Sequence, residues 1–178
     1  VHLGPLARFA VRHPKKALRL ALDRAGVRRA RAGPGGERLE VLDPRREDLE
    51  RHRRPDALTV NVLLPALALN GGTIHVLDLA QRLALGGVDV RVLCPLPVDR
   101  RLLDGAAFEP AIYTSAEALL RGAPPADATI ATWWRTGPWL ADLTRDGRAG
   151  APLYYVQDYE PWFYPDGDRR RRHVEATY

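Results

Sequence analysis

Two short apolar runs constrain the fold of this 178-residue chain more than any other feature. Residues 58–64 read Leu-Thr-Val-Asn-Val-Leu-Leu, residues 88–94 read Val-Asp-Val-Arg-Val-Leu-Cys, and a proline follows each run. Between the two runs lies a stretch whose apolar residues recur at helical spacing. This stretch follows Gly71-Gly72 and ends at Gly86-Gly87. A strand, a crossover helix and a second strand of this size predict a right-handed connection and a parallel sheet.

The same alternation continues, less regularly, toward the end of the chain. Further strands are predicted at residues 128–132 and 153–157, with helices at 115–120, capped by Ser115, and at 138–144. Strands alternating with helices are typical of an open α/β domain with a doubly wound parallel sheet. We therefore predict a Rossmann-like domain over residues 56–178.

Residues 1–55 have a different composition. They hold 15 arginines and lysines against 7 acidic residues, whereas residues 56–178 hold 12 against 15. Residues 14–25 predict a basic amphipathic helix, and the glycines and proline of 33–36 with the charged stretch 45–54 predict a linker. The helix could bind an anionic membrane surface, or it could pack its apolar stripe on the main domain or a partner.

Several classes of protein are disfavoured by what the sequence lacks. Cys94 is the only cysteine, so no intrachain disulfide can form. There is no Cys/His cluster for a metal, no G-x-S-x-G nucleophile motif, and neither G-x-G-x-x-G nor G-x-x-x-x-G-K-[ST] for a nucleotide. The acidic balance of the main domain disfavours nucleic acid. No apolar segment resembles a signal peptide or membrane span, so we expect a cytoplasmic protein, with membrane contact only at the periphery.

In doubly wound sheets, ligands bind outside the carboxyl ends of the strands, and this rule selects three loops. The first contains Asn70-Gly71-Gly72-Thr73 just before a helix. Glycines allow a ligand to approach the backbone, and the amides of a helix N-terminus favour phosphate. A plain tight turn remains the alternative. His75, on the following helix, is expected to be a packing residue.

The second loop contains Trp133-Trp134-Arg135. Aromatic faces beside a guanidinium suit stacking on sugar rings and hydrogen bonding to their hydroxyls or to an anionic substituent. Alternatively, neighbouring helices cover both rings and Arg135 is a solvated charge.

The third loop, residues 157–165, combines four aromatic side chains with Asp158 and Glu160 at the end of a strand that we expect to be buried. The carboxylates could accept hydrogen bonds from hydroxyls or act as acid or base, with Tyr159 and Trp162 forming part of a groove wall. The alternative is an aromatic plug in which Asp158 caps a helix far from the glycines. A groove shared by Gly71-Gly72 and Gln157-Asp158 would distinguish the two. The arginine run 169–172 is expected to be a solvated helix face.

Taken together, residues 64–75 with 91–92, 131–134 and 155–165 resemble the N-terminal half of GT-B glycosyltransferases of family 4. The sequence is most similar to rhamnosyltransferases of the WsaF type, which build bacterial surface polysaccharides. The resemblance covers residues 57–178. It implies two Rossmann-like domains facing each other across a cleft, of which this one holds the acceptor, with a donor-binding domain to follow.

The resemblance also implies roles for individual residues. Gly71, Gly72 and Thr73 would approach the donor diphosphate, and Gln157-Asp158 would lie beside the reacting sugar, where many members have His-Asp. Glutamine can hydrogen-bond a hydroxyl but cannot carry a proton.

Contacts to the acceptor sugar would come from Trp133, Trp134, Arg135, Tyr159 and Glu160. The implied function is the acceptor side of a retaining glycosyltransferase. It would use a nucleotide-sugar donor, dTDP-rhamnose, and an oligosaccharide acceptor, with neither cofactor nor metal. The competing interpretation is a carbohydrate-binding domain without chemistry.

Overall fold

The computed structural model describes residues 42–51 and 56–178, which belong to one compact unit, Glu40–Tyr178. The helix predicted at residues 14–25 and the glycine-rich part of the predicted linker lie outside the described residues.

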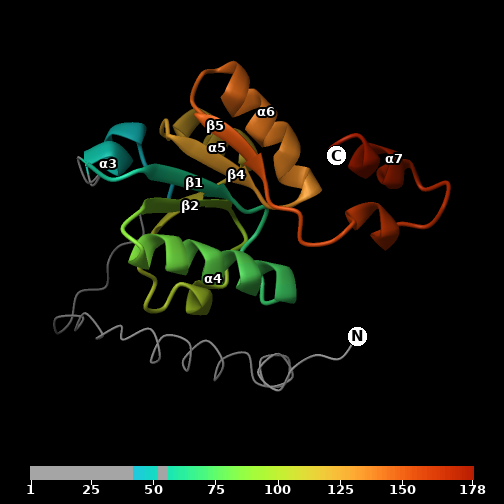
Figure 1. The fold of residues 1–178 in the computed structure, drawn as a ribbon, viewed down its shortest axis with the longest axis horizontal. Coiled ribbons are helices and arrows are strands. Elements are labelled where there is room, and N and C mark those ends of the chain that lie inside the picture. Colours follow the sequence, from blue (N-terminus) through green and yellow to red (C-terminus); the bar gives the residue numbers. More distant parts are fainter. Residues whose placement is uncertain (1–41, 52–55) are drawn as a thin grey trace. The chain divides into compact units, whose positions relative to one another are not determined.

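Five parallel strands form one sheet with helices on both faces, which confirms the predicted Rossmann-like α/β fold (Figure 1). The spatial order is β3-β2-β1-β4-β5, so the chain winds first to one side of β1 and then to the other. The strands are β1 (Thr59–Leu63), β2 (Asp89–Pro95), β3 (Glu109–Tyr113), β4 (Ala128–Ala131) and β5 (Ala151–Tyr154). The helices are α3 (Arg46–Arg51), α4 (Gly71–Leu85), α5 (Ala116–Gly122), α6 (Gly137–Arg145) and α7 (Arg169–Glu175), with 3-10 turns η1 (Arg100–Leu102), η2 (Trp134–Thr136) and η3 (Glu160–Phe163).

The two apolar runs of the sequence form the centre of the sheet. All five residues of β1 are buried, and β1 pairs with β2 from Thr59↔Asp89 to Leu63↔Leu93. A central parallel strand is covered on both faces, which is why its sequence is almost continuously apolar. The predicted crossover is α4, and Ser115 caps α5 as predicted, since its hydroxyl accepts the Ala118 N–H.

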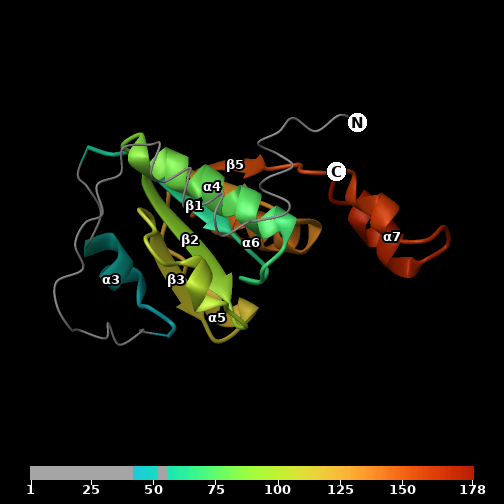
Figure 2. The ribbon, with the colours of Figure 1, turned by 90° about the horizontal axis from the view of Figure 1, so that it is seen from below.

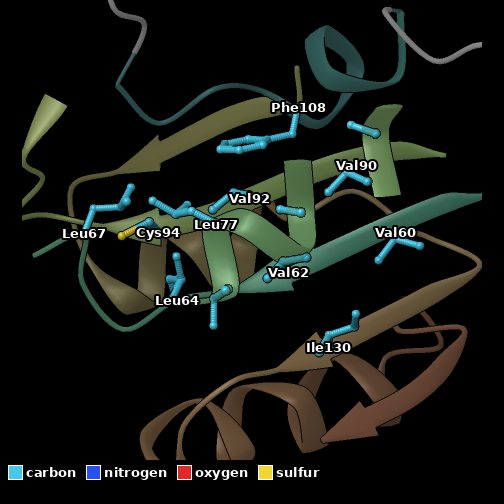
Figure 3. Packing of buried hydrophobic residues seen from close by; sticks show 13 residues of the cluster. Val60, Val62, Leu64, Leu67, Leu77, Val90, Val92, Cys94, Phe108 and Ile130 are labelled. Atoms are coloured by element: carbon cyan, nitrogen blue, oxygen red, sulfur yellow. The ribbon is translucent and has the colours of Figure 1, made fainter. Parts of the chain in front are cut away.

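Successive residues of β1 point to opposite faces and fill two separate cores. On one face, Val60 and Val62 pack with Val76 and Ala80 of α4, together with the neighbouring valines of β2 (Figure 3). On the other face, Leu63 packs in a second cluster with side chains of α5 and α6. Full burial of one such side chain stabilises the fold by about 1.5–3 kcal/mol. The two cores hold the carboxyl end of β1 in place beneath the loops that follow the strands.

Both edges of the sheet differ from the sequence prediction. Strand β3 was not predicted, because Pro110 interrupts a short run; an edge strand tolerates a proline that cannot donate to the ladder. Strand β5 was expected at 153–157 and buried, but it comprises Ala151–Tyr154 and is an edge strand, with Leu153 48% exposed. The loop after β5 therefore leaves the sheet three residues earlier than expected.

The charged stretch that the sequence assigned to a linker is partly folded against the sheet. Leu49 of α3 is buried in the same core as Leu63. Asp43 donates its N–H to the Ile112 carbonyl, and its carboxylate accepts hydrogen bonds from both the N–H and the hydroxyl of Thr114. Hydrogen bonds of Asp43 thus tie the chain just before this segment to β3 and Thr114.

After β5, the chain continues through η3 into α7, which lies to one side of the sheet (Figures 1 and 2). Arg169, Arg170 and Arg172 of α7 are exposed, as predicted, and Arg170 pairs with Asp168. None of the helices in the described part of the chain has the length and hydropathy needed to cross a membrane.

Candidate functional site

A pocket of about 610 Å³ lies where the loops after β1, β4 and β5 meet. All three loops selected from the sequence contribute to it, as expected for strands whose carboxyl ends share one edge of the sheet. Its walls are formed by Leu64, Pro65, Ala66, Asn70, Gly72, Thr73, His75, Thr132, Trp133, Tyr155, Val156, Gln157, Asp158, Glu160 and Phe163.

The first loop reaches the pocket through the start of α4. The Asn70 side chain caps this helix, since its Oδ1 accepts the Thr73 N–H at 2.8 Å. This bond occupies the Thr73 amide, and so the backbone amides left to meet a ligand are those of Gly71 and Gly72. Gly72 lines the pocket, whereas Gly71 is exposed outside it.

Gly72 and Gln157 approach each other closely across the pocket. A Cβ atom built on Gly72 would lie 3.2 Å from Oε1 of Gln157 and 3.4 Å from Oδ1 of Asn70. Only glycine leaves this space open without moving a neighbour. The shared groove predicted for the two loops is therefore present.

The second loop is held by threonine hydroxyls. Thr132 donates its hydroxyl to the Leu63 carbonyl at 2.7 Å, which joins the carboxyl ends of β4 and β1. The buried Thr136 hydroxyl accepts the N–H groups of Thr132 and Trp133 and donates to the Trp133 carbonyl. These bonds fix the turn that presents Trp133.

The two tryptophans of this turn have different positions. Trp133 lines the pocket, whereas the indole N–H of Trp134 donates to the Tyr164 hydroxyl at 3.2 Å. The Arg135 guanidinium lies 5.1 Å from the ring centre of Trp133 and 5.3 Å from that of Trp134. Trp134 and Arg135 are not among the lining residues, and Arg135 stabilises the tryptophan pair through cation–π contacts.

The third loop brings Gln157 and Asp158 to the pocket with exposed side chains. Asp158 accepts the N–H of the next residue, Tyr159, through Oδ1 at 2.8 Å. Asp158 is thus neither buried nor separated from the glycine loop, and this excludes the plug arrangement.

Glu160 links the second and third loops. It is only 3% exposed, and its Oε2 accepts the Trp134 N–H at 2.9 Å and the Tyr154 hydroxyl at 3.2 Å. Burial raises the pKa of this carboxyl above its usual range, a shift that the two hydrogen bonds oppose and that the nearby Asp158 charge increases. One oxygen of Glu160 therefore serves the protein itself rather than a ligand.

An aromatic cluster supports the third loop from behind. The Tyr178 hydroxyl donates to the Asp158 carbonyl at 2.8 Å and accepts the Glu160 N–H at 3.1 Å. Its ring makes contacts with those of Tyr154 and Tyr159, at 5.6 and 5.4 Å between ring centres. Both hydrogen bonds lie directly beside Asp158 and Glu160, so they fix the backbone that carries these side chains.

The structure thus brings together part of the predicted site. Predicted residues that line the pocket are Gly72, Thr73, Trp133, Gln157, Asp158 and Glu160, and those that do not are Gly71, Trp134, Arg135 and Tyr159. Trp162, expected in the groove wall, is 73% exposed outside the lining. Tyr155, Phe163 and His75 are lining residues that the sequence did not assign to the site. The expectation that His75 is a packing residue was wrong, because its side chain is exposed and lines the pocket. Its position one turn into α4, close to the glycine pair, was the signal that could have placed it there.

The pocket is acidic and carries no permanent positive charge. Asp158 and Glu160 are its carboxylates, and no arginine or lysine is among its described lining residues. The described part of the chain also has no group of three or more acidic, histidine or cysteine side chains placed to hold a metal ion. Comparisons with protein-family models, with curated proteins and with solved structures found no match.

Proposed function

We propose that this chain is the acceptor side of a retaining glycosyltransferase, which transfers a sugar from a nucleotide-sugar donor to an oligosaccharide. The observation that carries the proposal is the close approach of Gly72 to Gln157 in one pocket bordered by Trp133. It supports the family resemblance because residues 85 positions apart meet at a strand-end cleft, the usual place for a ligand in this fold.

The described residues could divide the work as follows. The Trp133 ring would stack on an apolar sugar face, while Gln157 and Asp158 would hydrogen-bond hydroxyls of the acceptor. The amides of Gly71 and Gly72 would face the donor diphosphate, with the dipole of α4 favouring its negative charge. Such positioning of the two reactants and stabilisation of the leaving group are the main sources of catalysis in transfer reactions of this kind.

A binding domain without chemistry is the second candidate. It is favoured by the absence of any arginine or lysine among the described lining residues, since a diphosphate is usually neutralised by such groups. If the chain is part of a glycosyltransferase, cationic groups elsewhere in the protein would have to neutralise the donor diphosphate. A pure binding domain would bind oligosaccharide but would neither use nor be affected by a nucleotide sugar.

The decisive experiment measures sugar transfer by the protein expressed from its complete reading frame. It is supplied with nucleotide sugars, dTDP-rhamnose first, and an oligosaccharide acceptor, and the products are analysed by mass spectrometry. Oligosaccharide binding without transfer from any nucleotide sugar would favour the binding domain. Transfer without dependence on the pocket would contradict our site.

Two substitutions test that dependence. Gly72→Val places a branched side chain against Gln157 and should lower turnover by well over tenfold in a protein that remains folded. Asp158→Asn should also lower turnover, whereas Asp78→Asn is the matched control, because Asp78 pairs with Arg82 on α4 outside the pocket. Equal kinetics for wild type and a folded Gly72→Val protein would reject the role of this loop.

A further inference from the structure

We infer that the acceptor sugar, which would lie beside Asp158 and Glu160, carries a cationic amino group rather than a carboxylate or phosphate. The inference rests on the proposed function, because it takes the ligand to be a sugar, and it deepens that function by naming the class of sugar. The charge and the unused hydrogen-bonding capacity of the pocket support it.

The first support is the sign of the charge. Asp158 and Glu160 line the pocket, and burial, with a smaller contribution from the nearby Asp158 charge, raises the pKa of Glu160. When both carboxyls are ionised, a bound anion would add a third negative charge, whereas a cation would relieve the repulsion. Arg135, the arginine of the second loop, is outside the lining and lies over the two tryptophan rings.

The second support is the unused capacity of the carboxylates. Both hydrogen bonds of Glu160 fall on Oε2, and within the described residues no donor reaches Oε1. Asp158 uses Oδ1 for the Tyr159 N–H, and the described chain offers no donor to its Oδ2. Ionised carboxylate oxygens only accept hydrogen bonds, so a ligand that binds to these oxygens in place of water has to supply donors. An ammonium group supplies three, and an ionised carboxylate none.

The third support is the aromatic wall. Tyr155 and Phe163 line the same pocket as the two carboxylates. The faces of aromatic rings attract cations. Carboxylates beside aromatic rings therefore suit an amino sugar, whose ring carbons pack on the wall while its ammonium group faces the acidic groups.

The test compares four probes that differ in charge: glucosamine, N-acetylglucosamine, glucose and glucuronate. The full chain is titrated with each at about pH 6, where a primary amine is protonated. Binding is followed through the indole N–H resonance of Trp133 in ¹H–¹⁵N spectra, which requires neither turnover nor a donor. Glucosamine should bind at least about tenfold more tightly than glucuronate, a difference of about 1.4 kcal/mol, with the neutral sugars between them. Added salt should reduce the preference.

Asp158→Asn should reduce the ratio of glucosamine to glucose affinity at least about threefold, and Asp78→Asn should leave it unchanged. An equal or greater affinity for glucuronate, or an unchanged ratio in Asp158→Asn, would overturn the inference. Binding of glucose without any preference for charge would overturn only this inference. No response to any of the four sugars would count against the proposed function as well.

Discussion

Removing the Glu160 carboxylate should destabilise the protein through the two donors that it satisfies. In Glu160→Ala, the Trp134 N–H and the Tyr154 hydroxyl lose their acceptor. A buried donor left without a partner costs about 1–3 kcal/mol. Tyr154 is only half-buried and can partly turn to water, so we expect a total loss of about 2–4 kcal/mol in the free energy of unfolding. That is a large share of the roughly 5–15 kcal/mol that stabilises a typical domain.

The measurement is urea unfolding followed by tryptophan fluorescence, with thermal unfolding in parallel. At about 4 °C per kcal/mol, the melting temperature should fall by roughly 8–16 °C. Glu160→Gln keeps a carbonyl oxygen that can accept both hydrogen bonds, so its loss should be under about 1 kcal/mol. The comparison of alanine with glutamine separates the loss of the acceptor from the loss of the charge.

Glu175→Ala is the matched control, because it removes a glutamate from α7 whose side chain is exposed and pairs with Arg171. An exposed ion pair of this kind contributes about 0–1 kcal/mol. The contrary result would be that Glu160→Ala is no more destabilising than Glu175→Ala while the slope of unfolding free energy against urea concentration stays the same. In that case the hydrogen bonds of Glu160 between the two loops would not stabilise the fold, and our account of Glu160 would be wrong.

Three further predictions concern pH, the thiol and the backbone. The folded-state pKa of Glu160 is raised, so protonation of Glu160 stabilises the fold fully below about pH 4, and this stabilisation is lost as pH rises through the folded pKa. The stability of the wild type relative to Glu160→Gln should therefore fall with rising pH. A rise would refute the pKa shift. Burial raises the pKa of Cys94 to about 12, so a thiol reagent should label it only as fast as the protein unfolds, and rapid labelling of the native protein would contradict this. Gly150→Ala would place a Cβ 2.3 Å from two backbone carbonyl oxygens at a φ of +62°, and should lower the free energy of unfolding by well over about 3 kcal/mol. Gly147→Ala, at a φ of +69° with no atom within 4 Å, should lower it by only about 1–2 kcal/mol. Equal losses would show that the backbone moves to relieve the contact with the carbonyl oxygens.

The sequence was sufficient to predict the central strands of the sheet but not its edge strands. Residues 58–64 and 88–94 predict their strands because a strand covered on both faces must be apolar throughout. Strands β3 and β5 lack that requirement. Pro110 and Pro152 lie within them, and only the tertiary structure shows that both strands are at an edge, where a missing N–H leaves no neighbour unpaired.

The meeting of Gly72 and Gln157 could be predicted from topology alone, since parallel strands bring their following loops to one edge. The orientation of individual side chains could not. Adjacent tryptophans suggested a sugar platform, but whether Trp133 or Trp134 faces the pocket depends on the Thr136 hydroxyl that shapes the turn and on Tyr164, which accepts the Trp134 indole N–H. These contacts span up to 30 residues, and no local pattern encodes them.

The edge position of β5 also explains the unusual composition of the third loop. A loop leaving a central strand is flanked by neighbouring strands on both sides, but the loop after β5 has a neighbour on one side only. Its position must therefore be fixed by side chains, and Glu160 and Tyr178 supply the hydrogen bonds that do so. The sequence predicted that Asp158, Tyr159 and Glu160 of this loop contact the ligand. In the structure, Glu160 Oε2 and Tyr178, which lies outside the loop, hold the loop in place. This leaves Gln157, Asp158 and Phe163 to face the pocket.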